Sequence, residues 1–539
     1  MKIRIRFAFV AFFLFFLSCI CVFCNVLTRP RKKAEKENNK IELLHSDRIY
    51  KDKENADILV LVGNVRMKQA NMYLFCDSAY YYELSNSFEA FGNVRMKQSD
   101  TLSLKSRYMY YDGMSQLMKA RQNVILTHRK VNLYTDSLNY DKLYDIGYFF
   151  EGGKLVDNGN VLVSDWGQYS LASKDASFYY NVKLNNPKFE LTSDTLHYNA
   201  NTKIGKVVGP SNILNGKNHI YTELGYYNTI TGNVELFNRS VLVDPQKTLV
   251  GDSLFYIKEK ALYYAFGNVS YVDKQNKGIL LSDYCEYSDS TGYAMSTKNT
   301  LYKDFSNVSD TLFVHADTIK LYTQNIRTDS VYRLLHAFYH VRSYRSDVQS
   351  VSDSLVYNTK EKCLTLYKDP IVWHGKQQIL GEEIYAFFND STIDSIRVDR
   401  QSLLVEKIDS VHFNQVASKT FRSIMEHGQI VENRADGNVY VTYYVFNKDS
   451  LMLGLNYTET THAKIQYKNR KMTRIWTPAA TGVFYPLLLI PDEKRFLESF
   501  AWFDYIRPVD KHDLFIWRGK RRGEELKYVS RKQSPLQSF

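Results

Sequence analysis

The heptapeptide Gly63-Asn64-Val65-Arg66-Met67-Lys68-Gln69 recurs without change as Gly92-Asn93-Val94-Arg95-Met96-Lys97-Gln98, 29 residues further along the chain. Gly and Asn both tolerate a positive φ, so we interpret the first three residues as a turn that launches a β-strand at the Val. The same triplet stands at 159–161, 232–234, 267–269 and 437–439, and degenerate forms stand at 122–124 and 339–341.

A second signature gives the period of this repeat: an acidic or hydroxyl residue is followed four positions later by Tyr. Successive first members are separated by 29, 30, 29, 29, 29, 29 and 31 residues, and Asp317 and Asp353 continue at looser intervals of 34 and 36. Asp175/Tyr179 breaks the spacing, and we treat it as coincidence. A sustained period near 29 predicts a solenoid-like array in which each unit contributes two strands of about ten residues. The regular pairs are Asp77/Tyr81, Ser106/Tyr110, Asp136/Tyr140, Asp165/Tyr169, Asp194/Tyr198, Glu223/Tyr227, Asp252/Tyr256 and Asp283/Tyr287.

Within a unit, apolar and charged residues alternate as they do in a half-buried strand. Val65 and Met67 fall on one face, and Arg66 and Lys68 fall on the other. Stacked units would align the apolar residues into a continuous interior wall, and we expect this wall to be the functional surface. The expected wall residues are Val65, Met67, Val94, Met96, Leu102, Leu104, Val124 and Leu126.

Composition agrees with an all-β protein. The 539 residues include 42 Tyr and 31 Phe but only 10 Pro, and short runs of Val, Leu, Tyr and Phe are broken by Asn, Asp, Gly and Ser. The net charge of +12 is spread along the chain, with dense clusters at Arg29–Lys33 and Arg518–Arg522 that no nucleic-acid motif accompanies. We therefore expect no nucleic-acid partner.

The N-terminus has the order of an export signal. Lys2, Arg4 and Arg6 precede an apolar run from Phe7 to about Leu27, so the chain is expected to leave the cytoplasm, with residues 1–27 either removed or kept as an anchor. Three of the six cysteines lie in this run. The other three, Cys76, Cys285 and Cys363, are too scattered for a disulfide framework and are expected to be small buried apolar side chains.

The chain lacks the motifs that would indicate catalysis or a metal site. It contains no His-Glu-x-x-His, no paired Cys-x-x-Cys and no Gly-x-Ser-x-Gly, and nothing places a pair of carboxylates in a cleft. Calcium-binding repeats are dense in Gly and Asp, whereas here one Asp recurs per repeat without a glycine run. We interpret that Asp as a turn residue that bonds local backbone amides, and the Tyr that follows it as a cross-strand packing residue. No enzymatic activity, cofactor or metal is expected.

The repeated segment Asp-Ser/Thr-Leu-x-Tyr-Asn/Asp identifies a family resemblance. It occurs at 136–141, 194–199 and 353–358, and together with the Gly-Asn-Val triplets and the export signal it resembles the OstA-like, or organic solvent tolerance, family of lipopolysaccharide transport proteins over roughly residues 45–450. The resemblance implies an elongated, twisted β-jellyroll that is open along one side and holds the acyl chains of lipid A inside. It also implies partners: lipopolysaccharide itself and other lipopolysaccharide transport proteins, stacked edge to edge.

These observations lead to one organisation and one preferred function. We expect an export signal or anchor at 1–27, jellyroll repeats at 45–300, more divergent repeats at 301–480, and a cap or docking tail at 481–539. The preferred function is a periplasmic lipopolysaccharide carrier or bridge, self-associating or tethered through its N-terminus. A structural or adhesive β-solenoid without lipid cargo is the alternative, because periodicity alone does not separate the two.

Overall fold

The computed structural model describes residues 40–521 and residue 524, apart from short internal gaps. The expected export segment 1–27, its three cysteines, the basic residues 29–33 and residue 522 therefore lie outside the described residues. The chain divides into two compact units, unit 1 (Met1–Tyr263) and unit 2 (Tyr264–Phe539). Unit 1 ends earlier than residue 300, where the repeat loosens in the sequence. The gaps are at 56, 100–101, 158, 171, 188, 307–309, 327, 390–391, 427–428, 469–470 and 522–523.

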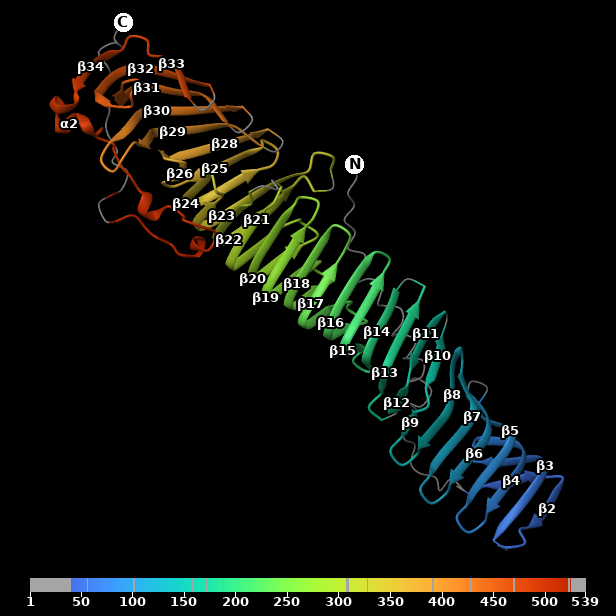
Figure 1. The fold of residues 1–539 in the computed structure, drawn as a ribbon. Coiled ribbons are helices and arrows are strands. Elements are labelled where there is room, and N and C mark those ends of the chain that lie inside the picture. Colours follow the sequence, from blue (N-terminus) through green and yellow to red (C-terminus); the bar gives the residue numbers. More distant parts are fainter. Residues whose placement is uncertain are drawn as a thin grey trace. The chain divides into compact units, whose positions relative to one another are not determined.

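Unit 1 consists of antiparallel strands, as the repeat predicted (Figure 1). Most strands have 10 to 13 residues and join their neighbours through tight hairpins. The strands are β1 (Glu42–His45), β2 (Arg48–Lys51), β3 (Ile58–Gln69), β4 (Met72–Tyr82), β5 (Ser87–Ser99), β6 (Leu102–Asp112), β7 (Leu117–His128), β8 (Val131–Asp141), β9 (Ile146–Phe149), β10 (Gly153–Asp157), β11 (Asn160–Ser164), β12 (Trp166–Ser170), β13 (Asp175–Asn186), β14 (Phe189–Asn199), β15 (Ile204–Asn215), β16 (Asn218–Asn228), β17 (Val234–Val243) and β18 (Lys247–Ile257), with β19 (Leu262–Asp273) crossing the boundary between the units.

Unit 2 continues the same antiparallel pattern, and its only described helices follow residue 486. The strands are β20 (Gly278–Ser288), β21 (Ala294–Asp304), β22 (Leu312–Gln324), β23 (Tyr332–Tyr344), β24 (Val348–Asn358), β25 (Cys363–Tyr367), β26 (Ile371–His374), β27 (Gln377–Leu380), β28 (Glu383–Asn389), β29 (Thr392–Lys407), β30 (Phe413–Glu426), β31 (Gln429–Phe446), β32 (Met452–Lys468), β33 (Lys471–Trp476) and β34 (Thr481–Pro486). Short helices follow: η1 (Leu487–Leu489), α2 (Asp492–Arg495), η2 (Asp504–Ile506) and η3 (Asp513–Phe515).

The Gly-Asn-Val triplet is a bulge more often than a turn, which corrects the sequence interpretation. In β3 the pairing with β4 shifts between Val62 and Val65, and the intervening Gly63 and Asn64 have φ of 84° and 45°. The same shift recurs at Gly92 in β5 and at Gly437 in β31. The triplet precedes a strand only at 159–161 and 232–234. The prediction of positive φ holds for the Gly in every copy, but for the Asn it fails at 160 and 233, where the triplet starts a strand; in the other copies the strand continues through the triplet.

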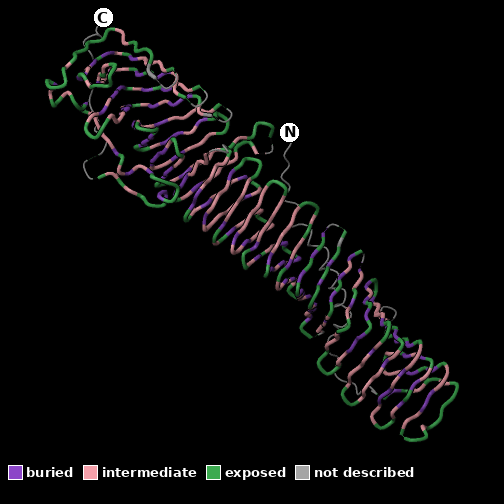
Figure 2. Tube along the Cα trace, viewed as in Figure 1, coloured by how far each residue is buried: buried purple, intermediate pink, exposed green. Residues whose placement is uncertain are grey.

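The bulges lie in alternate long strands and bend the sheet, so that the two halves of each long strand belong to different walls. In β3, residues 58–62 lie in what we call wall A and residues 65–69 in wall B. Leu61 from wall A and Val65 from wall B nevertheless join the same buried cluster. The walls therefore meet along the row of bulges and enclose an apolar interior, with hairpin turns at their free margins (Figure 2). This is the expected all-β jellyroll built from repeats of about 29 residues and open along one side.

The recurring Asp stabilises the bulge of the neighbouring strand. Asp77 Oδ2 accepts a hydrogen bond of 2.8 Å from the Asn93 side chain, and Asp165 Oδ2 accepts one of 2.6 Å from Asn181. Asp136 accepts from a backbone amide, that of Asn123, as the sequence interpretation had it for all of them, whereas Asp77 and Asp165 accept from an Asn side chain. In unit 2 Asn299 donates to Asp283 Oδ2 at 2.7 Å, and at the next bulge a histidine replaces the Asn, with His340 Nδ1 2.8 Å from Asp317 Oδ2.

Substituting Gly92 by Ala should test the bulge. At φ of 68° an Ala is strained, and its Cβ would also meet the side chain of Asp77. We expect a loss of at least about 1–2 kcal/mol, the cost of the left-handed conformation for a residue with a Cβ. Gly147→Ala in β9 is the matched control, because nothing lies closer than 3.9 Å to its added Cβ. Urea unfolding of both variants measures the difference, and equal losses would contradict the role of the bulge.

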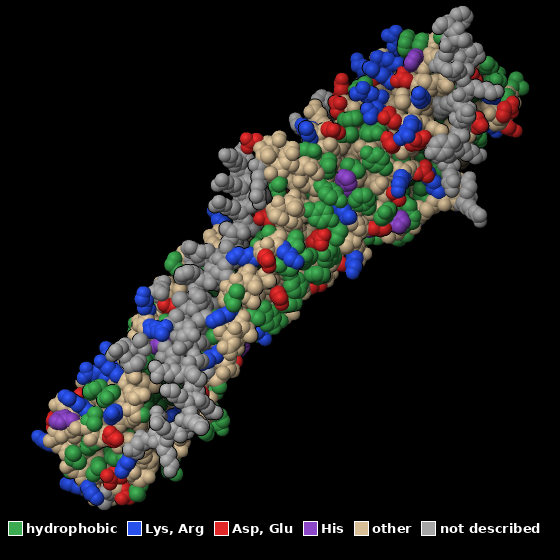
Figure 3. All heavy atoms as spheres, turned by 180° about the vertical axis from the view of Figure 1, so that it is seen from behind, with side chains coloured by type: hydrophobic (Ala, Val, Ile, Leu, Met, Phe, Trp, Pro, Cys, Tyr) green, Lys and Arg blue, Asp and Glu red, His purple; other side chains and the backbone are tan. Residues whose placement is uncertain are grey.

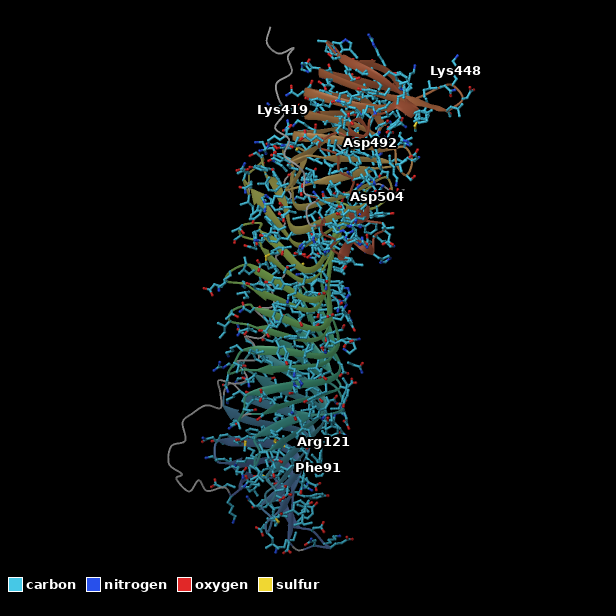
Figure 4. The ribbon with its side chains drawn as sticks, turned by 90° about the vertical axis from the view of Figure 1, so that its left-hand side faces the viewer. Phe91, Arg121, Lys419, Lys448, Asp492 and Asp504 are labelled. Atoms are coloured by element: carbon cyan, nitrogen blue, oxygen red, sulfur yellow. The ribbon has the colours of Figure 1, made fainter. Side chains whose placement is uncertain are left out.

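A C-terminal strap, residues 487–521, covers the outer face of wall B in unit 2. It leaves β34, the last strand, and runs back across the strands toward β22 (Figure 1); Asp492 and Asp504 mark its course in Figure 4. Phe503, 2% exposed, joins a buried cluster with Trp373 and Leu403, while the adjacent Leu404 faces the interior cluster. Of the segment expected as a cap or docking tail, 481–486 is thus a paired strand and 487–521 packs on the chain itself.

Two buried glutamines hold the strap by its backbone. Gln415 donates to Arg495 O at 2.8 Å and accepts from Leu497 N at 2.9 Å. Gln378 repeats this arrangement with Ala501 O at 2.9 Å and Phe503 N at 2.8 Å. Each amide satisfies one donor and one acceptor of a segment that has no strand partner there.

Candidate functional site

The structure brings the sequence-predicted wall residues together in the interior of unit 1. All eight come from wall B of strands β3, β5, β6 and β7, and cross-strand pairs such as Met96 opposite Leu104 set them side by side. Val65, Met67, Val94, Met96, Leu104 and Val124 are buried, Leu126 is partly buried against the same cluster, and Leu102 is partly buried.

Methionines line a small apolar cavity at the N-terminal end of this interior. Its volume is about 40 Å³, and it lies between the two walls, with Met67 and Met96 contributed by wall B. Sequence reasoning missed the residues that wall A supplies. The lining comprises Met67, Met72, Met96, Met109, Met118, Ile41, Leu74, Phe88 and Tyr111, with Lys68 and Gln69 at the margin.

The interior has a low polarity that is visible in its titratable groups. Burial, and then the nearby Asp77 carboxylate, raise the pKa of Cys76 to about 12. Burial likewise raises the pKa of Tyr81, and its hydroxyl has no hydrogen-bond partner. Both groups therefore stay neutral near pH 7, and no carboxylate lines the cavity. Apolar chains suit this environment, and charged groups do not.

Cationic side chains occupy the outer face of the same wall. Arg66, Arg95 and Lys97 alternate with the buried wall residues and are exposed. Lys68, at the cavity margin, lies 5.6 Å from the ring centroid of Tyr73. Lys and Arg side chains are accordingly frequent around the N-terminal end of unit 1 (Figure 3). A molecule with acyl chains and anionic groups would find its apolar part matched inside and its charged part matched at the margin of the cavity, where Lys68 lies.

The sequence comparison matches this part of the chain to one family. The profile of the family described as OstA-like protein matches residues 38–194. The matched region contains every residue that lines the methionine cavity and all eight predicted wall residues. No curated protein matches the chain.

A solved structure with a similar segment is the crystal structure of LptH from Pseudomonas aeruginosa, titled the LptA-homologous periplasmic component of the conserved lipopolysaccharide transport device. The identity is 12%, the TM-score is 0.14, and the match covers 25% of this chain and 81% of that chain.

Across residues 40–521, outside the gaps, no three His, Cys, Asp or Glu side chains gather as a metal site would require. No helix in the described part of the chain is both long enough and apolar enough to cross a membrane. The three described cysteines are free, with Cys76 and Cys363 buried.

Proposed function

We propose that the chain is a non-enzymatic carrier or bridge of the periplasm that holds acyl chains of lipopolysaccharide between walls A and B of unit 1. The methionine-lined cavity carries this proposal, because it places an adaptable apolar surface at the end of a continuous apolar interior. The OstA-like match supports it, since the match spans the whole cavity. The N-terminal apolar segment would deliver the chain to the periplasm and either be removed or tether it to the membrane.

The cavity must widen to accept a chain. Its volume of about 40 Å³ is below the range of roughly 300–1,000 Å³ found for small-molecule sites. Methionine is the side chain suited to such a change, because its three rotatable bonds let it repack around a guest. Each methylene that leaves water contributes about 0.8 kcal/mol, so one acyl chain along the wall would offset substantial repacking.

The ends of the strand array supply the surfaces for partners. In unit 1, β1 and β2 both pair with β3, and the described residues place no strand on their other side. In unit 2, β33 and β34 both pair with β32 in the same way. Such edges present free backbone N–H and C=O groups to an added strand. We propose that lipopolysaccharide transport proteins, or a second copy of this chain, stack there.

Site-directed photo-crosslinking tests the lipid proposal. A photoreactive amino acid at Val94 or Met96, both facing the interior, should capture lipopolysaccharide in cells or in vitro. The same probe at Arg95 or Lys97, which alternate with them on the outer face, should capture at least several-fold less. Gel shift with antibody detection of the lipid reads out the product.

The four positions control for one another, because they lie in one strand and differ only in the face they occupy. Labelling at all four positions, or at none, would contradict the carrier. Absence of labelling together with an intact fold would leave the structural or adhesive β-solenoid as the better description of the chain.

A further inference from the structure

The outer face of wall A in unit 1 carries a polar depression of about 540 Å³. This volume lies within the range of small-molecule sites. The depression spans strands β12 to β16 and is separate from the interior, because Leu196 faces the buried cluster while the adjacent His197 lines the depression. The lining comprises Gln168, Ser170, Ser173, Asp175, Ser177 and His197, followed by Tyr198, Asn199, Thr202, Ile204, Lys206 and Tyr226.

The depression lies where a cross-strand row of this face contains a small side chain, Ser177. Along this face Phe91, Tyr108 and Arg121 are consecutive cross-strand partners, and Phe91 and Arg121 lie near each other in Figure 4. At the depression the neighbouring row instead contains Ser177, opposite Gln168 on one side and His197 on the other. That row continues through Lys206 to Tyr226.

Aromatic rings flank the depression at both ends. Trp166 and Tyr179 lie 5.0 Å apart between ring centroids, and Tyr179 meets His197 edge-on at 5.5 Å. At the other end Tyr226 packs edge-on against Phe237 at 6.0 Å. These rings are partly exposed, and so they offer apolar surface next to polar groups.

Several polar groups in the row are available to a ligand. His197 uses Nδ1 for a 2.8 Å hydrogen bond with Ser177, which leaves Nε2 without a partner in the described part of the chain. Lys206 lies over the ring of Tyr226 at 5.5 Å and makes no hydrogen bond there. The Gln168 amide and the Tyr226 hydroxyl are likewise unbonded among described residues. The row thus presents hydrogen-bond donors from Gln168, Lys206 and Tyr226, and it presents acceptors on the Gln168 amide and the Tyr226 hydroxyl.

The charges of the depression cancel. Lys206 is its one cation, and Asp175, which accepts a 2.6 Å hydrogen bond from Asn199, is its one anion. Burial, followed by the nearby Lys206, lowers the pKa of His197, so the imidazole is neutral near pH 7. A polyanion or an anionic membrane surface would find no excess of positive charge here.

We propose that this depression binds a saccharide chain, with Gln168, His197 and Lys206 contacting hydroxyl groups and the flanking rings stacking on the sugar faces. A sugar ring offers hydroxyls that donate and accept around its edge and C–H groups on its faces, which is the combination that the row matches. The saccharide is either the sugar part of a lipopolysaccharide or a free polysaccharide. The proposal does not rest on lipid binding in the interior.

Tryptophan fluorescence of the full-length protein tests this site, because Trp166 is the only Trp before residue 373. The protein is titrated with maltoheptaose, with core oligosaccharide released from lipopolysaccharide by mild acid, and with inorganic phosphate. We expect a saturable change with one or both saccharides that is lost in Trp166→Phe, and none with phosphate. Preference for the core oligosaccharide would identify lipopolysaccharide as the source, and preference for maltoheptaose a free polysaccharide.

A matched pair of double variants separates the site from general effects on the sheet. Lys206→Ala with Tyr226→Ala should weaken binding about tenfold or more, whereas Lys119→Ala with Tyr110→Ala should leave it unchanged. The control pair has the same geometry, with Lys119 at 5.7 Å from the Tyr110 ring on the same outer face. Circular dichroism verifies that both variants fold. Equal weakening by both pairs, no saturable response to either saccharide, or an equal response to phosphate would overturn the proposal.

Discussion

Asp513→Ala should destabilise the strap region of unit 2 by about 3–5 kcal/mol, the usual cost of removing one partner of a buried ion pair. Asp513 Oδ2 accepts hydrogen bonds of 3.1 Å from Arg342 Nη2, 2.7 Å from Arg518 Nη1 and 3.1 Å from the backbone N–H of Val509. Arg342 is only 1% exposed, and its Nε and Nη1 already lack partners among the residues that the structure describes. Removing the carboxylate therefore leaves a buried, uncompensated guanidinium. Hydrogen exchange in β23 and β24 should accelerate by about two to three and a half orders of magnitude, at 1.4 kcal/mol per tenfold.

The same carboxyl predicts an acid-labile strap. The hydrogen bond from Arg518 lowers the pKa of Asp513 below its ordinary value of 3.8. A group whose folded pKa is depressed stabilises the fold above its unfolded pKa, and that contribution is lost as the pH falls through the folded value. Exchange protection of β23 should therefore fall below about pH 4 in the wild-type chain and show less pH dependence in Asp513→Ala.

Asp492→Ala is the control for both measurements. Its side chain is 93% exposed, and its 3.2 Å ion pair with Arg495 is at the surface. Exposed pairs contribute about 0–1 kcal/mol, so exchange in β23 should stay near the wild-type rate. If Asp492→Ala and Asp513→Ala behaved alike, the buried network would not be what holds the strap.

The fold of unit 1 could be predicted because its determinants are local and repeated. The alternation in Val65-Arg66-Met67 assigns buried and exposed faces within one half-strand, and the structure confirms it for Val65 and Met67. Whether Gly-Asn forms a bulge or a turn is not determined by these two residues themselves. Both conformations need a positive φ at the Gly, and the residues before it decide between them. Five strand residues, 58–62, lead into Gly63 and give a bulge. Before Gly232, by contrast, Asn228 accepts the hydrogen bonds of a turn.

The sequence predicted only the wall B part of the candidate site. The alternation of inward and outward side chains continues past the bend between the walls in one strand but reverses there in the next. In β7 the inward residues Met118 and Val124, on either side of the bulge, are both even-numbered. Counting every second residue along β7 therefore also predicts the inward residues of wall A. In β6, the even-numbered Leu104 and the odd-numbered Met109 both face inward, so the alternation reverses between them. No residue type in β6 marks that change, since the extra residues lie in the neighbouring strands. The interior positions that wall A contributes therefore required the structure.

The strap was not predictable beyond its existence as a distinct C-terminal segment. Its anchors are single residues in strands about 80 to 170 positions earlier in the chain, such as Gln415 and Arg342, and no periodicity connects them to the tail. The sequence does show that the outer face of wall B changes from charged to apolar residues between the units. Wall B has Arg95 and Lys97 facing outward in unit 1, but Leu403 and Val405 facing outward in unit 2, and such apolar residues need a cover.

Gln378→Met should release the middle of the strap at a cost of about 3–6 kcal/mol. The Gln378 side chain is fully buried and makes three hydrogen bonds at once: it accepts from Trp373 Nε1 at 3.1 Å and from Phe503 N at 2.8 Å, and donates to Ala501 O at 2.9 Å. Methionine keeps the length of the side chain but leaves these three buried groups unsatisfied, at about 1–3 kcal/mol each, part of which water recovers as the strap lifts.

Proteolysis reads out this release, since a lifted strap makes the backbone at Lys494 and Arg495 accessible to trypsin. Cleavage after Lys494 or Arg495 should rise by at least about a hundredfold in Gln378→Met, the factor that corresponds to the lower end of the expected cost. Gln377→Met is the control, because the adjacent side chain points to the other side of β27 and makes no hydrogen bond within the described part of the chain. Cleavage at the wild-type rate in Gln378→Met would show that apolar packing around Phe503 holds the strap without the amide.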